Sequence, residues 1–329
     1  MANHLNGIVI KSQSGFFTVH TDDGSQVVAR VRGRLKQEQR DTDLIATGDR
    51  VTISIAPDGS ANVEAVAERE RALTRLAPSA KGRGGRRWDR QGYLSEREQV
   101  IVANPDEVVF VFSCAEPDPR LRMLDRFLVG AEAQQIPAVI CANKIDLVGG
   151  IEGGREWFGL YEDIDYPVIY TSAITGEGVD ELRTQLTGKL SVLAGPSGAG
   201  KSSLLNAMQP GLGLTAKQVS EATGKGRHTT VVPELLPLEG GGWVADTPGI
   251  RALALFDTDP EELDAYFPEI APLVADCQFS DCTHIVEPGC AVIAAVEAGL
   301  IHPERYESYA ILREEHQRLA DSYWWGINE

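Results

Sequence analysis

Long hydrophobic runs are absent from this chain of 329 residues. No apolar run approaches the roughly 18 residues that a membrane span needs, which argues against an integral membrane protein. The first residues, MANHLNGIVI, lack the basic region and apolar core of a signal peptide, so we expect a cytoplasmic protein with no membrane partner. Charged residues at 24% and aromatic residues at 7% are close to globular averages, which excludes a fibrous repeat and wholesale disorder.

Cysteine is scarce, with five residues in the whole chain, so a small disulfide-stapled scaffold is excluded. Cys114 and Cys141 lie in apolar, strand-like runs, whereas Cys277, Cys282 and Cys290 cluster late in the sequence. In a cytoplasmic chain such a cluster indicates a metal site before it indicates disulfides.

Basic residues are fewer than acidic ones, and the net charge of −17 taken alone argues against a nucleic-acid partner. The distribution changes that conclusion, because residues 1–100 carry a balance of +3 and the remainder carries −20. Between Arg69 and Arg97 there are nine basic residues and three acidic ones, with Trp88 and Tyr93 among them. This stretch is either a solvated linker or a loop that contacts a phosphate backbone and stacks on bases.

Residues 5–75 contain short β-branched runs separated by turn signals, with Asp23-Gly24 and Asp58-Gly59 at positions typical of hairpin turns. About five short strands with almost no helix between them predict a small closed barrel of the OB type. An SH3-like barrel fits the same composition. OB barrels often bind oligonucleotides, but a fold alone does not establish a function.

From about residue 100, near-continuous apolar runs alternate with helical stretches. This pattern predicts a mostly parallel sheet covered by helices on both faces. Beyond about residue 260 we expect short helices around the cysteine cluster, and a last helix from Pro303 to about Ser322.

A phosphate-binding loop is predicted by GPSGAGKS, which matches GxxxxGK[ST] and stands between the apolar run LSVLA and the helical stretch SLLNAM. Its glycines allow backbone amides to surround phosphate oxygens at a helix N-terminus. Lys201 would reach the β- and γ-phosphates, and the Ser202 hydroxyl would ligate Mg²⁺. The residues assigned to this loop are Gly195, Pro196, Ser197, Gly198, Ala199, Gly200, Lys201, Ser202 and Ser203.

Guanine is the base that the sequence favours. Asn143, Lys144 and Asp146 form an NKxD pattern after the run PAVICA, where the carboxylate can accept two hydrogen bonds from guanine that adenine does not offer. Lys144 would cover the base plane, and Asn143 would tie the base loop to the phosphate loop. Ser172 and Ala173 supply a companion loop whose amide can donate to the guanine carbonyl. These features disfavour a P-loop kinase or an ATPase.

Two further motifs suit a nucleotide triphosphate and its metal. Asp246 and Gly249 fit DxxG, in which the carboxylate holds Mg²⁺ through water and the glycine amide faces the γ-phosphate. The glycine-rich stretch 223–230 between them and the phosphate loop resembles a switch loop. Either Thr229 or Thr230 would complete the Mg²⁺ site, and we favour Thr229.

The order of the motifs is unusual, because the guanine motifs precede the phosphate loop, whereas Ras-like GTPases have the reverse order. Such an order indicates a circular permutation, which preserves the sheet because the binding loops meet at one edge. Essentially the whole chain resembles the bacterial family of small-ribosomal-subunit-dependent GTPases, RsgA or YjeQ. The features that carry this resemblance are the permuted order, the barrel, the motifs GPSGAGKSS, GRHTT and DTPG, and the late cysteines.

The resemblance implies a GTPase that binds the small ribosomal subunit and its rRNA, is stimulated by it and acts late in its assembly. It also implies a multidomain α/β protein, and we expect a monomer that binds GTP and GDP and hydrolyses GTP to GDP and phosphate. The expected parts are an OB-like barrel (1–75), a basic linker (76–99), a circularly permuted P-loop GTPase domain (100–258) and a helical zinc-binding domain (259–329).

The sequence lacks one residue that is familiar from Ras-like GTPases. Those enzymes have a glutamine directly after DxxG that orients the attacking water, and this chain has Ile250 there. We therefore expect slow intrinsic hydrolysis. The resemblance suggests His228 as the group that orients water, beside Thr229 and Lys201. The rival hypothesis is a GTP-locked, rRNA-binding assembly factor with negligible turnover of its own.

The late cysteine cluster has the spacing Cys277-x4-Cys282-x-His284-x5-Cys290. Three thiolates and one imidazole form a complete ligand set for tetrahedral Zn²⁺, and the family places zinc at this pattern. Because no coordination position remains open for water, we expect one structural zinc that holds short helices together.

Overall fold

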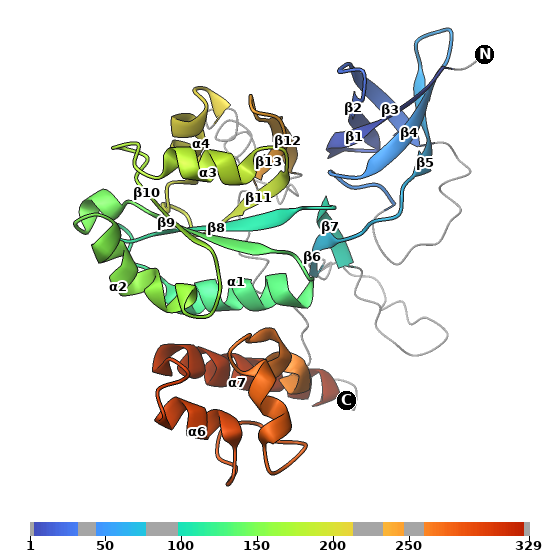
Figure 1. Cartoon of the computed structure of the whole chain (residues 1–329). Coiled ribbons are helices and arrows are strands. Elements are labelled where there is room, and N and C mark those ends of the chain that lie inside the picture. The colour runs from blue at the N-terminus through green and yellow to red at the C-terminus, as the bar shows by residue number, and fades with distance from the viewer. Residues whose placement is uncertain (1–2, 32–43, 77–97, 213–232, 247–259, 326–329) are drawn as a thin grey trace.

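The computed structural model describes residues 3–31, 44–76, 98–212, 233–246 and 260–325. Three bodies follow one another along the chain: a barrel, a sheet covered by helices, and a small helical domain beneath one of those helices (Figure 1). No helix among the described residues combines the length and the apolar character that crossing a bilayer requires.

The barrel contains five strands whose order closes on itself, β1-β2-β3-β5-β4 with β4 returning to β1. Strands β3 and β5 run parallel and their neighbours antiparallel, which is the OB arrangement and excludes the SH3-like alternative. Gly24 and Gly59 occupy the two expected hairpin turns with positive φ. The strands are β1 (Asn3–Gln13), β2 (Phe16–Thr21), β3 (Gln26–Val31), β4 (Arg50–Ile55) and β5 (Ala61–Val66).

The central domain confirms the predicted mostly parallel sheet, with strand order β10-β9-β8-β11-β13-β12. All its pairings are parallel except that of β12, which is antiparallel to β13. Every residue of β8 is buried, as expected for a strand covered on both faces. The strands are β8 (Glu107–Ser113), β9 (Ala138–Asn143), β10 (Val168–Thr171), β11 (Leu190–Ala194), β12 (Glu234–Pro237) and β13 (Trp243–Asp246).

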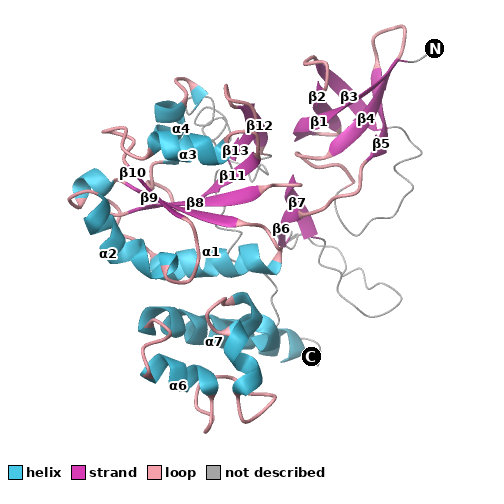
Figure 2. Cartoon of the chain, in the orientation of Figure 1, coloured by secondary structure: helices cyan, strands magenta, loops and turns pink. Residues whose placement is uncertain are grey.

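Helices cover both faces of this sheet, with α1 and α2 on one side and α3 and α4 on the other (Figure 2). The face of α1 toward the sheet is apolar because Leu124, Leu128 and Ala131 recur at helical spacing, and all three are buried. The elements are α1 (Leu121–Ala133), the short 3-10 turn η2 (Ile145–Leu147), α2 (Ile151–Glu162), α3 (Val179–Leu186) and α4 (Lys201–Met208).

The barrel joins the central domain through a strand pairing that the sequence did not predict. Strand β1 extends beyond its barrel partner β4 and pairs with β12 at Lys11 and Glu234, so eleven strands form one continuous sheet. The Lys11 ammonium lies 2.7 Å from the Glu234 carboxylate. Thr47 adds a hydrogen bond of 3.0 Å to the Pro233 carbonyl. A separate pair, β6 (Ala72–Leu76) and β7 (Glu98–Ala103), lies beside this junction.

The C-terminal domain consists of short helices around one longer helix, as predicted. Its last helix begins at Pro303 as expected and continues to Trp325, beyond the predicted end at Ser322. Val129 of α1 belongs to the apolar core of this domain, so the two domains share a packed interface. The helical elements are η4 (Pro260–Tyr266), η5 (Ala271–Asp276), α6 (Ala291–Glu297) and α7 (Pro303–Trp325).

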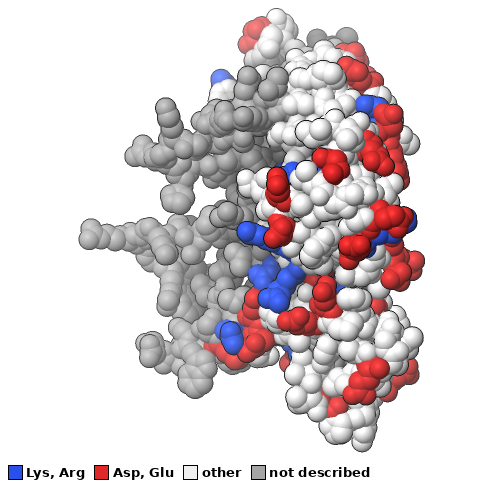
Figure 3. Space-filling view, turned by 90° about the vertical axis from the view of Figure 1, so that its left-hand side faces the viewer, with Lys and Arg blue, Asp and Glu red and all other residues white. Residues whose placement is uncertain are grey.

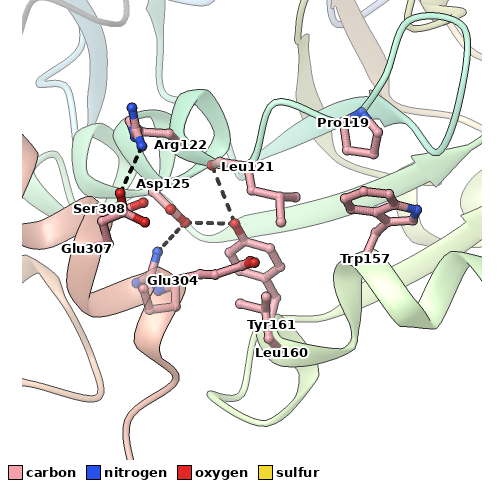
Figure 4. Close-up of a pocket in the computed structure, with 11 residues that line it drawn as sticks. Pro119, Leu121, Arg122, Asp125, Trp157, Leu160, Tyr161, Glu304, Glu307 and Ser308 are labelled. Carbon is pink, nitrogen blue, oxygen red and sulfur yellow. Dashed lines mark hydrogen bonds and ion pairs between the residues drawn. The ribbon is translucent and has the colours of Figure 1, made fainter. Parts of the chain in front are cut away.

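A buried arginine connects the two domains at the edge of a pocket between α1, α2 and α7 (Figure 4). Arg305 of α7 is 1% exposed, and its guanidinium donates to Asp125 of α1 at 2.5 Å and to Glu269 at 2.7 and 3.2 Å. The Tyr161 hydroxyl of α2 also donates to Asp125, at 2.7 Å. Burial raises the pKa of Tyr161, and the neighbouring Asp125 carboxylate raises it further, so the hydroxyl keeps the proton it donates.

Candidate functional site

The predicted nucleotide-binding motifs follow the carboxyl ends of four parallel strands. Asn143 ends β9, Thr171 ends β10, Ala194 ends β11 and Asp246 ends β13. Carboxyl ends of parallel strands lie at one edge of a sheet, which is where open α/β sheets bind ligands. Motifs scattered over about a hundred positions of sequence therefore meet at a single edge.

The phosphate loop follows β11 and leads into α4, which begins at Lys201. Gly195 and Gly200 both have positive φ, at 145° and 97°. A Cβ atom at Gly195 would stand 2.1 Å from the Val111 carbonyl oxygen, and one at Gly200 would stand 2.2 Å from the Asn143 amide nitrogen. Only glycine fits at either position, so the loop's curvature depends on these two residues.

Lys201 folds back over this loop, with its ammonium donating to the carbonyls of Gly195 at 2.7 Å and Pro196 at 3.0 Å. The lysine thus places its charge at the start of the loop, among the backbone groups expected to surround phosphate. The other loop residues divide by exposure: Ala199 is buried, Ser202 is half-buried, and Ser197, Gly198 and Ser203 are exposed.

Asn143 ties the base loop to the phosphate loop, as predicted. Its side-chain nitrogen donates to the Ala199 carbonyl at 2.8 Å, and its oxygen accepts from the Thr171 hydroxyl at 3.2 Å. The Cys141 sulfur lies 3.3 Å from the same hydroxyl. Asn143 is 1% exposed, so its amide orientation is fixed from both ends. No local pattern in the sequence indicates that Thr171 is the partner that fixes it.

The remaining guanine-motif residues form the two loops beside this link. Lys144 has φ of 66° and donates from its ammonium to the Glu116 carbonyl. Asp146 lies in η2 and is exposed, so its carboxylate is accessible to a ligand that would donate hydrogen bonds to it. Ser172 is buried, and its hydroxyl accepts from the amides of the following turn at 3.1 and 3.3 Å. Ala173 follows it, half-buried.

Part of the predicted metal and switch machinery lies outside the described residues, namely His228, Thr229, Thr230, Gly249 and Ile250. The structure places the other two predicted Mg²⁺ ligands close to the phosphate loop. Ser202 stands in the first turn of α4, and the backbone of Asp246 pairs in register with Leu193 of β11.

The late cysteines and His284 do converge into a cluster. One ligand atom from each of Cys277, Cys282, His284 and Cys290 lies within 4.8 Å of all the others. The Cys277 and Cys290 sulfurs are 4.0 Å apart, and His284 Nδ1 is 3.5 and 3.4 Å from them.

These separations fit tetrahedral zinc, whose bond lengths imply edges of about 3.8 Å between two sulfurs and about 3.5 Å between sulfur and nitrogen. The other side of the histidine ring faces a carboxylate, with Nε2 3.2 Å from Asp264 Oδ2. Burial raises the pKa of the Cys282 thiol, so a bound cation is needed to hold it as a thiolate.

The two early cysteines have no such role. Cys114 and Cys141 are buried in the central domain, where burial raises the pKa of each thiol to about 12. Both sulfurs therefore stay protonated near neutral pH, and they act as small apolar side chains.

Two family models match this chain, the RsgA GTPase over residues 87–256 and the RsgA N-terminal domain over residues 6–63. A relative from Gemmatimonas aurantiaca, named small ribosomal subunit biogenesis GTPase RsgA, is 45% identical over 96% of this chain and 98% of its own length. A relative of the same name from Moorella thermoacetica is 42% identical over 93% of this chain and 95% of its own.

Solved structures agree with these sequence matches. YjeQ from Thermotoga maritima superposes with a TM-score of 0.76 at 35% identity, over 96% of this chain and 99% of that one. YloQ, described as a circularly permuted GTPase, gives a TM-score of 0.71 at 28% identity over 96% of each chain. The permuted order deduced from the motifs is thus found in a structure of the same architecture.

Proposed function

This chain belongs to the RsgA GTPase family, and on that premise we propose that its GTP hydrolysis takes place on the small ribosomal subunit, late in the assembly of that subunit. The proposal also includes stimulation of hydrolysis by the subunit, a cytoplasmic location and a monomeric state. The observation that carries it is the match over nearly the whole length to relatives named for this role, with the barrel and the metal cluster included.

Nucleotide binding in this proposal follows from the edge of the sheet. The amides of residues 195–203 and the Lys201 ammonium would surround the phosphates, and the exposed Asp146 carboxylate would pair with guanine. Asn143 holds the two loops at a fixed separation through its 2.8 Å bond to Ala199. Both halves of one nucleotide are then bound by a preorganised surface, which reduces the ordering cost of binding.

Magnesium would be held by Ser202, Thr229 and Asp246, the hydroxyl and carboxylate oxygens that a hard cation prefers. When bound, the ion would neutralise negative charge on the phosphates. Ile250 stands where Ras-like enzymes carry the glutamine that orients water, and its side chain cannot hydrogen-bond. Another group must orient the attacking water, and we assign that role to His228.

A test of this assignment is the substitution His228→Ala. We expect hydrolysis stimulated by small subunits to fall by about 100-fold, within the range for loss of a group that handles the reacting water. The affinity for GTP, measured with a fluorescent analogue, should stay close to that of the unaltered protein. Stimulated turnover equal to that of the unaltered protein would remove His228 from the mechanism.

The cluster of Cys277, Cys282, His284 and Cys290 holds one structural zinc in this proposal. Four protein ligands leave no position for water, so the ion would have no catalytic part. Its effect is to fix the loops between short helices that share a small apolar core.

Contact with rRNA requires basic surface on an acidic protein. Figure 3 shows acidic side chains spread over the face in view, with the largest group of basic ones near its middle. We assign rRNA contact to the stretch from Arg69 to Arg90, the barrel and the zinc domain. On the barrel, the Arg30 guanidinium lies over the exposed Phe16 ring at 4.6 Å, which pairs a cation with a stacking surface.

The first experiment measures GTP hydrolysis by the purified protein alone and with purified small subunits. Large subunits replace small ones in one control, and ATP replaces GTP in another. We expect strong stimulation by small subunits only and no hydrolysis of ATP. Tight GTP binding without stimulation would contradict the proposal and favour the rival function, a GTP-locked rRNA-binding factor with negligible turnover.

A further inference from the structure

The second nitrogen of His284 points away from the cysteine cluster and toward Asp264 of η4, at 3.2 Å. We propose that Asp264 is a positioning residue of the metal site: its carboxylate accepts a hydrogen bond from Nε2 and thereby presents Nδ1 to the ion. This inference rests on the proposed zinc site. It adds a fifth residue to that site, contributed by a different element from the four ligands.

The surroundings of His284 leave its ring little freedom. The residue is fully buried and has φ of 60°, a backbone conformation that non-glycine residues rarely adopt. Two tyrosines of α7 hold the loop backbone, since Tyr306 donates to the His284 carbonyl at 2.8 Å and Tyr309 to the Thr283 carbonyl at 3.0 Å. A ring fixed in this way can bind a metal through Nδ1 only if Nε2 carries the proton, and Asp264 is the acceptor in place for that proton.

The carboxylate has no competing cation in the part of the chain that the structure describes. No lysine or arginine nitrogen there lies within 4.0 Å of Asp264, and its carboxylate faces the His284 ring. The Asp264 side chain is only 14% exposed, so its charge is poorly hydrated and favours a donor that is itself charged or metal-bound. A carboxylate behind a metal-binding imidazole raises the basicity of that imidazole and fixes its tautomer.

The position of Asp264 in the fold gives the contact a second effect. Element η4 packs against both α1 of the GTPase domain and α7. The metal ligands themselves lie further along the chain, between residues 277 and 290. Through Asp264, the metal therefore stabilises the element that docks the C-terminal domain, in addition to its own loop.

The test compares full-length protein with the variants Asp264→Ala and Asp264→Asn. The matched control is Glu262→Gln, which removes an exposed carboxylate from the same element. Zinc affinity is measured by competition with a chromogenic chelator. The geometry around the metal is measured separately from the visible absorption of the cobalt-substituted proteins at saturating metal.

We expect Asp264→Ala to weaken zinc binding by about 10- to 100-fold and to shift the cobalt absorption, as loss of an outer partner does in other sites. The zinc affinity of Asp264→Asn should fall less, because the amide oxygen of asparagine still accepts one hydrogen bond. Glu262→Gln should match the unaltered protein in both measurements. If Asp264→Ala does not fold, the zinc affinity and cobalt absorption of Asp264→Asn test the inference instead.

Unchanged zinc affinity in the Asp264 variants, or an equal loss in Glu262→Gln, would overturn the inference while leaving the zinc site intact. Unaltered protein that binds no zinc would instead overturn the proposed metal site, and this inference with it. The two failures are distinguished by the metal content of the unaltered protein.

Discussion

Asn143 uses both ends of its side chain to join parts of the protein. Its amide nitrogen binds the phosphate loop and its oxygen binds Thr171, so each atom has a fixed partner. This buried amide has one favourable orientation, because the reversed one would place its oxygen against the Ala199 carbonyl oxygen, and both are acceptors. The separation of base loop and phosphate loop therefore depends on Thr171, a residue outside the NKxD motif and the phosphate loop.

The substitution Thr171→Val tests this role, since it keeps the side-chain shape and removes the hydroxyl. We expect the affinities for GDP and GTP to fall by about 5- to 10-fold, the equivalent of one hydrogen bond of roughly 1 kcal/mol. Thr171→Ser retains the donor and should bind like the unaltered protein. Calorimetric titration measures both variants, and equal affinity in the valine variant would show that Asn143 is held by its other contacts.

The sequence was sufficient to predict the residues of the nucleotide motifs, because each motif is contiguous and its chemistry depends on local spacing. It was insufficient for the partners of those residues. Thr171 and Asn143 are 28 positions apart, and Asp264 and His284 are 20 apart. Such contacts depend on which strands and helices become neighbours, and no local pattern in the sequence carries that information.

Among the elements, α7 is held against the central domain by a side chain that is costly to bury. Arg305 carries its charge into the interface, where two carboxylates surround it and the Phe267 ring lies 4.6 Å from its guanidinium. The charges are balanced only while Arg305 stays in place, because Asp125 and Glu269 are almost fully buried as well.

We expect Arg305→Met to destabilise the docked C-terminal domain by about 3 to 5 kcal/mol, because it leaves two buried carboxylates without a cation. Arg318→Met is the matched control, since Arg318 lies on the same helix and is 72% exposed in its pair with Glu314. Urea unfolding and limited proteolysis of the two variants give the comparison. Similar resistance in both would mean that apolar packing alone secures the interface.

Strand β12 could not be predicted from the sequence. Its four residues, Glu234–Pro237, include two buried leucines and a terminal proline, which is too little periodicity to indicate a strand. Strand β8 was predictable because seven consecutive buried residues form a pattern with one interpretation. The junction with the barrel went unpredicted for this reason, although the barrel and the parallel sheet were each expected.

Across the whole molecule, the three bodies are joined by different means. Strand pairing connects the barrel to the central sheet, and a buried ion-pair network with shared apolar packing connects the helical domain. The metal cluster belongs to the helical domain, so we expect its effect to reach that domain and its contact with α1 but not the nucleotide-binding edge of the sheet.

Removal of zinc by a chelator tests that confinement. We expect the C-terminal domain to become sensitive to protease and to lose its part of the thermal transition, because zinc supplies much of the free energy that folds such small domains. The affinity for GDP should change by less than about twofold, since additivity holds for distant, independent sites. A comparable loss of nucleotide binding would show that the two domains do not respond separately.

The pairing of β1 with β12 also bears on the order in which the molecule is completed. Lys11 and Glu234 are 223 positions apart, so this seam has one of the longest chain separations that the fold contains. Contacts of long sequence separation form late, because closing their loop costs entropy before any contact offsets it. During synthesis the barrel must wait for most of the central domain before its first strand meets its last partner. A nascent chain that ends before Glu234 therefore leaves this end of β1 without its partner strand.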